Sequence, residues 1–197
     1  MKKTTIGCLV VAGVLALTLL ILVGSAIGRY NTLVTQRESI RGAWAQVENV
    51  LQRRANLIPN LVETVKGYAA QEKQIFQEVA DARSRLIGGI RKPSGMSPQE
   101  AAAANAGLTS ALGRLLAISE AYPDLKSNQN FIRLQDELAG SENRITTERR
   151  RYNEAVRAYN TSLMRFPTSL IARTFNFTEE EYFEAEEGAK QVPKVEF

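Results

Sequence analysis

The chain has 197 residues, of which 44% are hydrophobic and 23% charged, and a formal net charge of +4; this length has room for one domain and a membrane anchor. It contains no histidine and a single cysteine, Cys8. Intrachain disulfides, zinc sites of the Cys/His kind and catalysis that uses a histidine base are therefore excluded. We expect no catalytic residue, no metal site, no cofactor and no enzymatic activity.

The charge is distributed unevenly along the chain. Residues 29–173 carry 21 Lys and Arg against 14 Asp and Glu, a net +7, whereas residues 174–197 carry 2 against 7, a net −5. Because the basic residues alternate with acidic ones along predicted helix faces, the pattern is that of a solvated surface, and no nucleic-acid partner is expected. The basic run 149–151 is compatible both with lipid headgroups and with pairing to nearby acids.

The N-terminal segment from Thr4 to Gly28 carries no charge. As a helix it would rise about 37 Å, enough to cross a hydrocarbon core of about 30 Å. A cleaved signal peptide has a shorter apolar core, of about 7–15 residues, although Gly24-Ser25-Ala26 resembles a cleavage site. The segment predicts an uncleaved transmembrane helix.

The charges that flank this span bear on its orientation. Lys2 and Lys3 precede it, and Arg29, Arg37 and Arg41 follow it closely, so the two sides are nearly balanced. A very short basic tail before a long apolar run favours an N-terminus in the cytoplasm. We expect the bulk of the chain on the periplasmic or extracellular side of the cytoplasmic membrane, with membrane lipid as a partner.

Small residues recur within the span at a spacing of four. Ala12 and Ala16, then Gly24 and Gly28, form small-xxx-small pairs that let helices approach closely in lipid. Glycine and alanine are also common in spans that do not associate, so the pattern indicates helix packing only weakly.

A heptad pattern of mostly apolar residues begins after the span, which predicts a long helix. Its positions are Ile40, Trp44, Val47, Leu51, Arg54, Ile58, Leu61, Val65, Tyr68, Glu72, Ile75, Val79, Ala82 and Leu86. The phase continues through Pro59, which predicts a bend there rather than an end. We expect one helix that continues the span and ends at Gly88-Gly89, with about 87 Å between Arg29 and Leu86.

The next helix is marked by a capping box. Ser97 is the cap, Pro98 occupies the first helical position and Glu100 follows three residues after the cap. Pro123 disfavours helix at the preceding residue, so this helix is expected to end at Ala121.

A second heptad pattern predicts a third long helix, which runs from Phe131 to Phe166 and ends at Pro167. A short fourth helix is predicted from Thr178, with Glu181 completing its cap. Helices with such seams bury them against one another. The predicted fold is therefore all-α, a transmembrane helix that continues into an antiparallel bundle of three long helices plus a short fourth.

Arg54 is a charged residue on the apolar seam. A buried charge has to be paired or to reach solvent, so we expect a carboxylate partner, for which Glu120 and Asp124 are candidates. The alternative is a side chain that packs its stem and keeps its guanidinium in water.

Several segments together resemble the LemA family. They are LQRRANLIPNL over 51–61, VETVKGY over 62–68, EAYPDLK over 120–126 and RYNE over 151–154, with Tyr30-Asn31, Tyr159-Asn160 and Phe166-Pro167. The resemblance covers nearly the whole chain. It implies a bacterial single-span protein with an antiparallel helical bundle, and it supplies no catalytic residues.

The resemblance and the seams define candidate interaction residues. They are Arg53, Arg54, Asn56, Pro59, Asn60, Glu63, Glu120, Tyr122, Pro123, Asp124, Tyr152, Asn153, Tyr159 and Asn160. The asparagines are candidates for caps or hydrogen bonds between helices rather than for chemistry. We divide the chain into a tail and span (1–28), a helical domain (29–173) and an acidic C-terminal tail with a short helix (174–197).

Two functions fit these features. The first is a self-associating, membrane-anchored scaffold of the cell envelope, and the second is an adaptor that binds a membrane protease, sensor or envelope enzyme. A homo-oligomer of high order is expected for three reasons: the small residues of the span, the opposite charges of body and tail, and a seam of about 87 Å that a second helix of about 36 Å cannot cover alone.

Overall fold

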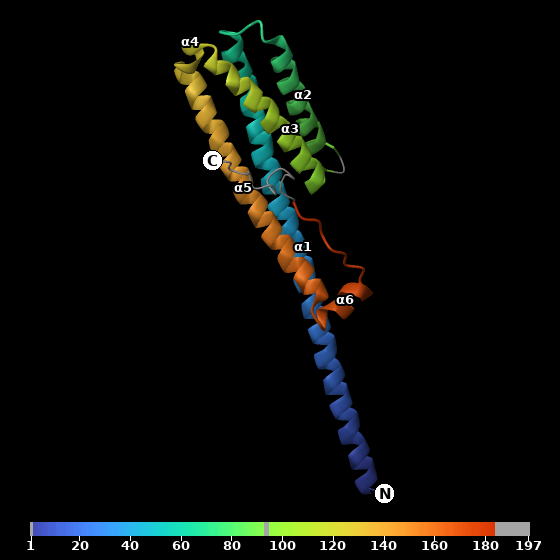
Figure 1. Cartoon of the computed structure of the whole chain (residues 1–197). Helices are drawn as coiled ribbons and strands as arrows, with labels where there is room; N and C mark the ends of the chain where they lie inside the picture. The colour runs from blue at the N-terminus through green and yellow to red at the C-terminus, as the bar shows by residue number, and fades with distance from the viewer. Residues whose placement is uncertain (1, 93–94, 184–197) are drawn as a thin grey trace, which may run out of the picture. The chain divides into compact units, whose positions relative to one another are not determined.

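The computed structural model describes residues 2–92 and 95–183, and their secondary structure is helical with no strand (Figure 1). This confirms the predicted all-α class. The helices are α1 (Lys2–Lys66), α2 (Lys73–Ile90), α3 (Pro98–Ala117), the 3₁₀ turn η1 (Ile118–Glu120), α4 (Pro123–Lys126), α5 (Gln129–Met164) and α6 (Thr168–Thr174).

The chain forms two compact units, and α1 and α5 each contribute to both. The first unit, called here the span unit, contains the residues up to Arg41 together with Glu154–Glu180. The second, called the bundle unit, contains Gly42–Asn153 together with the described residues 181–183.

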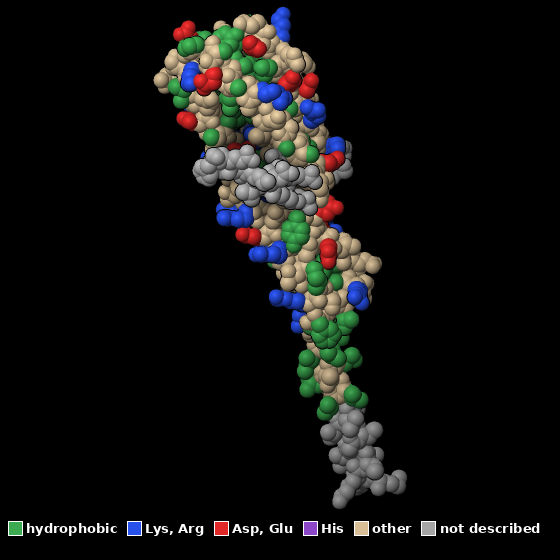
Figure 2. Space-filling model, viewed as in Figure 1, with side chains coloured by type: hydrophobic (Ala, Val, Ile, Leu, Met, Phe, Trp, Pro, Cys, Tyr) green, Lys and Arg blue, Asp and Glu red, His purple; other side chains and the backbone are tan. Residues whose placement is uncertain are grey.

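In the span unit, the described start of α1 is apolar on all sides. Its large side chains from Val14 to Ile27 are 49–70% exposed, and Figure 2 shows this hydrophobic surface without charged side chains. The stretch is long and apolar enough to cross a membrane. A helix that is apolar all round and has no protein against it is suited to lipid.

Further along, the pattern on α1 changes to one buried stripe. The buried apolar residues of this stripe are Leu33, Ile40, Val47, Leu51, Ala55, Ile58, Leu61 and Val65. Within the bundle unit α2 packs against α3 (Figure 1). The second stretch apolar enough for a span, Pro98–Glu120, is 39% buried in its most apolar window, as a core helix of this bundle would be.

The predicted single helix from the span to Leu86 is wrong. α1 does continue through Pro59, as expected, but it ends at Lys66 and the chain turns over residues 67–72 before α2 begins. Glu72, a predicted seam residue, is the N-cap residue of α2. The apolar spacing of Val79, Ala82 and Leu86 belongs to this separate helix.

This turn also removes one argument for oligomerisation. The stripe was expected to be longer than its partners and to need another chain. Instead, the eight buried residues of this stripe are at most 4% exposed, and Trp44 is the one apolar residue of the predicted seam on α1 that is partly exposed. The seam on the described part of α1 is therefore mostly covered within the chain.

The later elements match most of the sequence expectations. Ser97 and Glu100 form the predicted capping box at the start of α3. α5 matches the predicted third helix except at its end, because it stops at Met164, two residues before the predicted Phe166. The helix predicted from Thr178 is wrong, because residues 177–183 are not helical; the rest of that segment lies outside the described residues. A short helix, α6, forms at 168–174 instead.

Candidate functional site

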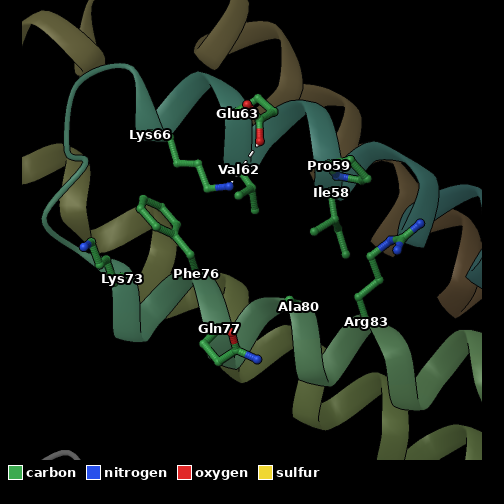
Figure 3. Close-up of a pocket in the computed structure, with 10 residues that line it drawn as sticks. All are labelled: Ile58, Pro59, Val62, Glu63, Lys66, Lys73, Phe76, Gln77, Ala80 and Arg83. Atoms are coloured by element: carbon green, nitrogen blue, oxygen red, sulfur yellow. Dashed lines mark hydrogen bonds and ion pairs between the residues drawn. The ribbon is translucent and has the colours of Figure 1, made fainter.

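An open groove lies between α1 and α2 in the bundle unit (Figure 3). It encloses about 390 Å³. Its lining residues are Ile58, Pro59, Val62, Glu63 and Lys66 from α1, with Lys73, Phe76, Gln77, Ala80 and Arg83 from α2. Pro59 and Glu63, both predicted interaction residues, are exposed on its rim, so the family-like segment forms one wall of the groove.

The groove has an apolar floor and a mainly basic rim. Ile58 and Phe76 are buried, whereas Lys66 and Lys73 are exposed. The Lys66 Nζ lies 3.2 Å from an oxygen of Glu63 and 5.8 Å from the centre of the Phe76 ring. The ten lining residues sum to Lys66, Lys73 and Arg83 against Glu63, a net charge of +2, so the groove suits a segment that is apolar in part and acidic.

Pro59 explains why Arg83 faces α1. A proline has no N–H, so the carbonyl four residues earlier, that of Ala55, loses its helical donor. Arg83 Nε donates to the Ala55 oxygen at 2.8 Å and replaces that donor from α2. The proline of the signature thus creates an attachment point between the two walls of the groove.

Arg54 is the centre of a buried polar site in the bundle unit. It is 4% exposed, and its Nη1 lies 2.5 Å from Glu142 Oε2 of α5 and donates to Asn105 Oδ1 of α3 at 2.7 Å. The expected carboxylate partner is confirmed, but it is Glu142 rather than Glu120 or Asp124. One guanidinium therefore connects α1, α3 and α5.

Tyrosines of the family-like segments hold the turn that follows α1. Tyr122 Oη hydrogen-bonds with Gln71 and donates to Glu72 Oε1 at 3.5 Å. The Tyr68 hydroxyl accepts a hydrogen bond from Asn128 Nδ2 at 2.9 Å. These bonds join the turn at 67–72 to the connection between α3 and α5, which explains why tyrosines stand at the exposed position 68 and the half-buried position 122.

Two predicted asparagines bind backbone with their side-chain amides. In the span unit, Asn160 Nδ2 donates to the Glu180 carbonyl at 2.9 Å, and its Oδ1 accepts from the Glu180 N–H at 3.0 Å. In the bundle unit, Asn153 makes the same pair with the Phe183 carbonyl and N–H, both at 2.9 Å. Each amide thus satisfies one residue of a non-helical segment completely.

The two neighbouring tyrosines differ in their polar contacts. Tyr152 donates to the Glu181 carbonyl at 2.8 Å, and its ring centre lies 5.2 Å from that of Trp44. The Tyr159 hydroxyl is buried without a hydrogen-bond partner among the described residues. Burial raises the pKa of Tyr159, so it remains a neutral core side chain.

The remaining predicted residues lie at the surface. Arg53, Asn56, Asn60, Glu120, Pro123 and Asp124 are exposed. Arg53 lines a hollow of about 300 Å³ beside Arg133 and Arg144 of α5, and Glu120 pairs with Lys126 at 2.7 Å. Of the basic run, Arg151 pairs with Glu148 at 2.7 Å.

The small residues of the span are accessible. Ala16, Gly24 and Gly28 are exposed, and a side-chain carbon added to either glycine would meet no atom within 4 Å. Ala12 lies outside the residues whose side chains are described. This face is therefore free for a neighbouring helix in the membrane, as far as the described residues extend.

The sequence pointed to several residues that form polar contacts, but it did not identify the side chains that pair with them. Glu142, Asn105 and Arg83 were not singled out, although each completes a polar contact of a residue that was predicted or of its neighbour. A signal existed for Arg83, because an internal proline always leaves a carbonyl without its helical donor.

Comparison with known proteins identifies the family. The model of the LemA family matches residues 43–197. The chain belongs to the LemA family. It is also 31% identical to the magnetosome protein MamQ 2 of Paramagnetospirillum magneticum, over 91% of this chain and 73% of that protein. The identity is 30% to MamQ of Magnetospirillum gryphiswaldense, over 85% and 69%, and 25% to the protein LemA of Metamycoplasma hominis, over 82% and 71%.

The family and the apolar start of α1 together describe a membrane-associated helical protein. None of these relatives carries the name of an enzyme. What the described residues offer is an open groove, buried polar contacts between helices and amides that hold backbone.

Proposed function

We propose that this LemA-family protein is a membrane-anchored helical scaffold of the bacterial cell envelope that acts by binding and self-association rather than by catalysis. The observation that carries this proposal is the open groove between α1 and α2, which is built from the signature segment and has a net charge of +2. Beside the buried floor, Val62 is partly exposed and Ala80 is exposed, so a segment of a second chain can reach apolar surface in the groove.

The occupant that fits best is the acidic tail of a neighbouring copy. Glu180 and Phe183 are held by asparagines of their own chain. The part of the tail beyond them, 184–197, carries four Glu against two Lys, a net charge of −2, and ends in QVPKVEF, which includes apolar residues. Opposite charge and apolar content match the basic rim and apolar floor of the groove. A tail that enters the next copy makes a head-to-tail contact, which closes into a ring or extends as a filament. The exposed small residues of the span give such copies a second place to pack.

The second candidate function is that of an adaptor, in which the same groove takes a segment of a membrane protease, sensor or envelope enzyme. The same groove supports the adaptor function, because its basic rim and apolar floor also suit a peptide segment of another protein. The two functions differ only in the identity of the bound chain.

Photo-crosslinking from the groove separates the two functions. A photoreactive residue at Gln77 in the groove is compared with one at Gln99, an exposed glutamine of α3 outside it. A product of twice the chain mass from position 77 only, lost when residues 184–197 are deleted, supports the scaffold. A product with a different protein supports the adaptor. Equal products from both positions, or none, contradict a binding groove.

We also propose that the N-terminus lies in the cytoplasm and the bulk of the chain on the periplasmic or extracellular side of the inner membrane. Support comes from the short Lys2-Lys3 tail before the long uncharged run. Protease added to spheroplasts should degrade the chain after the span. Protection until lysis would reverse the topology.

A further inference from the structure

A second apolar surface lies in the span unit, outside the span itself. Met164, Phe166, Leu170 and Phe175 are 68%, 80%, 55% and 56% exposed. They lie at the end of α5, in α6 and just after it. Exposed large side chains gathered in this way mark an interaction surface.

Contacts within the span unit fix this surface at the membrane end of α1 (Figure 1). Arg29, the first charged residue after the uncharged run, donates from Nη1 to Thr168 Oγ1 of α6 at 3.2 Å. The ring of Tyr30 lies 4.9 Å from that of Phe175 and 5.6 Å from that of Phe177, centre to centre. The first charged residue after a span lies near the lipid headgroups. Because Thr168, the first residue of α6, is hydrogen-bonded to Arg29, α6 begins close to the headgroups.

The charges around the surface are basic. Residues 155–178 include Arg157, Arg165 and Arg173 and no acidic residue. The next acidic residues are Glu179 and Glu180, of which Glu180 pairs with Arg37 at 3.1 Å. Anionic lipid headgroups attract such arginines.

A hollow of about 370 Å³ opens on the same part of the unit. Its walls include the apolar side chains of Leu163, Met164, Ala172 and Phe177, with Arg173 and Glu179 also lining it. The apolar walls match a lipid acyl chain. Arg173 and Glu179 offset each other within the hollow, so the attraction for an anionic headgroup comes from the arginines of the surface as a whole.

We propose that the α5–α6 corner, comprising Met164–Phe177, is a second membrane-binding surface that inserts its apolar side chains among anionic lipids beside the span. Aromatic and apolar side chains flanked by arginines are the composition of interfacial anchors. The bilayer is favoured over a protein partner because the span that leads into Arg29 already places this surface at the headgroup level. The surface then holds α6 against the membrane, in addition to the anchorage by the span.

Lipid quenching of a fluorophore tests this surface in the full chain. Leu170→Cys is labelled in a Cys8→Ser background and reconstituted at low protein density in phosphatidylcholine vesicles, with and without phosphatidylglycerol. Lipids that carry a spin label near the headgroup should quench the probe, and more strongly when phosphatidylglycerol is present. Ile27→Cys, at the end of the span next to Arg29, calibrates the quenching expected at the headgroup level, and Ile132→Cys, an exposed apolar position near the other end of α5, is the unquenched control.

The arginines supply a matched test of the lipid chemistry. The double variant Arg165→Glu/Arg173→Glu should shift the equilibrium of the α5–α6 corner from the membrane-bound toward the released state by at least about fivefold per arginine removed. It should also abolish the effect of phosphatidylglycerol on quenching. Arg91→Glu, an exposed position after α2, should change nothing. A Leu170 probe that is no better quenched than the Ile132 probe would overturn the proposal. A second result would also overturn the proposal: no quenching by lipid, together with quenching between labelled copies that disappears on dilution. That result would assign the surface to contact with a second copy.

Discussion

Two buried polar sites of this chain, around Arg54 in the bundle unit and around Asn160 in the span unit, meet the same requirement by different chemistry. Arg54 brings a full charge into the core and is matched by Glu142 and Asn105. Asn160 brings a neutral amide and is matched by the N–H and carbonyl of Glu180. A charge needs a particular partner at a particular place, so it specifies which helices pack and in which register. An amide matches any peptide group, so it can hold a segment that has no regular structure.

The largest effect is therefore expected at Arg54. Arg54→Ala should lower the free energy of unfolding by about 3 kcal/mol, toward the lower end for a broken buried pair because Glu142 is 44% exposed and can regain water. Thermal unfolding of the full chain in mild detergent, followed by circular dichroism, measures it. Arg91→Ala is the control at an exposed position, and equal effects of the two substitutions would show that Arg54 contributes no specific pairing.

Arg83 should show the next largest effect, because it donates to a carbonyl that Pro59 leaves without a helical donor. Arg83→Ala is expected to cost about 2 kcal/mol, the range for a lost hydrogen bond from a charged donor to a partly buried acceptor. In a Pro59→Ala background the backbone N–H of residue 59 can serve the Ala55 carbonyl, so the same substitution should cost clearly less. A double-mutant cycle measures this coupling, and additive effects would contradict the assigned role of the proline.

A smaller and more local effect is expected at Asn160. Asn160→Ala removes two hydrogen bonds to Glu180 and should cost about 1.5 kcal/mol. Hydrogen exchange should then speed up at the Glu180 amide while the amides of α3 keep their protection. Asn56→Ala, at an exposed asparagine of the same family-like set, should leave both observables nearly unchanged. A uniform loss of protection would mean that the segment at 180 is part of the global core.

The capping box of α3 gives the smallest of these effects and a pH dependence. Ser97→Ala should cost about 1 kcal/mol. Hydrogen bonds to Ser97 and the charge of Lys92 lower the pKa of Glu100 below 4.5. Its contribution to stability is therefore complete above pH 4.5 and is lost as the pH falls through the lowered value. The stability difference between the wild type and Glu100→Gln, measured from pH 7 to pH 3, should shrink over that range, and a difference that does not change with pH would contradict this role.

The sequence predicted helix boundaries and caps better than it predicted which side chains contact each other. The span, the capping box at Ser97, the passage of the helix through Pro59 and the end of α5 before Pro167 all follow from local chemistry. The turn at 67–72 was missed because the heptad phase continues across it, and an apolar spacing does not report a reversal of direction. The false helix at Thr178 had a valid capping pattern, but Asn153 and Asn160 bind the backbone of Phe183 and Glu180 instead.

The site was predictable to a similar degree. Arg54 could be singled out because it is a charged residue on an apolar seam. Its need for a carboxylate partner followed from the free-energy cost of burying an unpaired charge. Which carboxylate it is depends on the packing of α5 against α1, which no local pattern reports. The groove depends on the same kind of information, since its second wall, α2, exists only because the chain turns after Lys66.

The central claim, that the protein works as a self-associating scaffold, is tested most directly by native mass spectrometry of the full chain in mild detergent. A self-associating chain should give a homo-oligomer of high order at micromolar concentration, and this oligomer should dissociate when residues 184–197 are deleted. A monodisperse monomer at concentrations well above micromolar would contradict the scaffold and leave the adaptor function in its place.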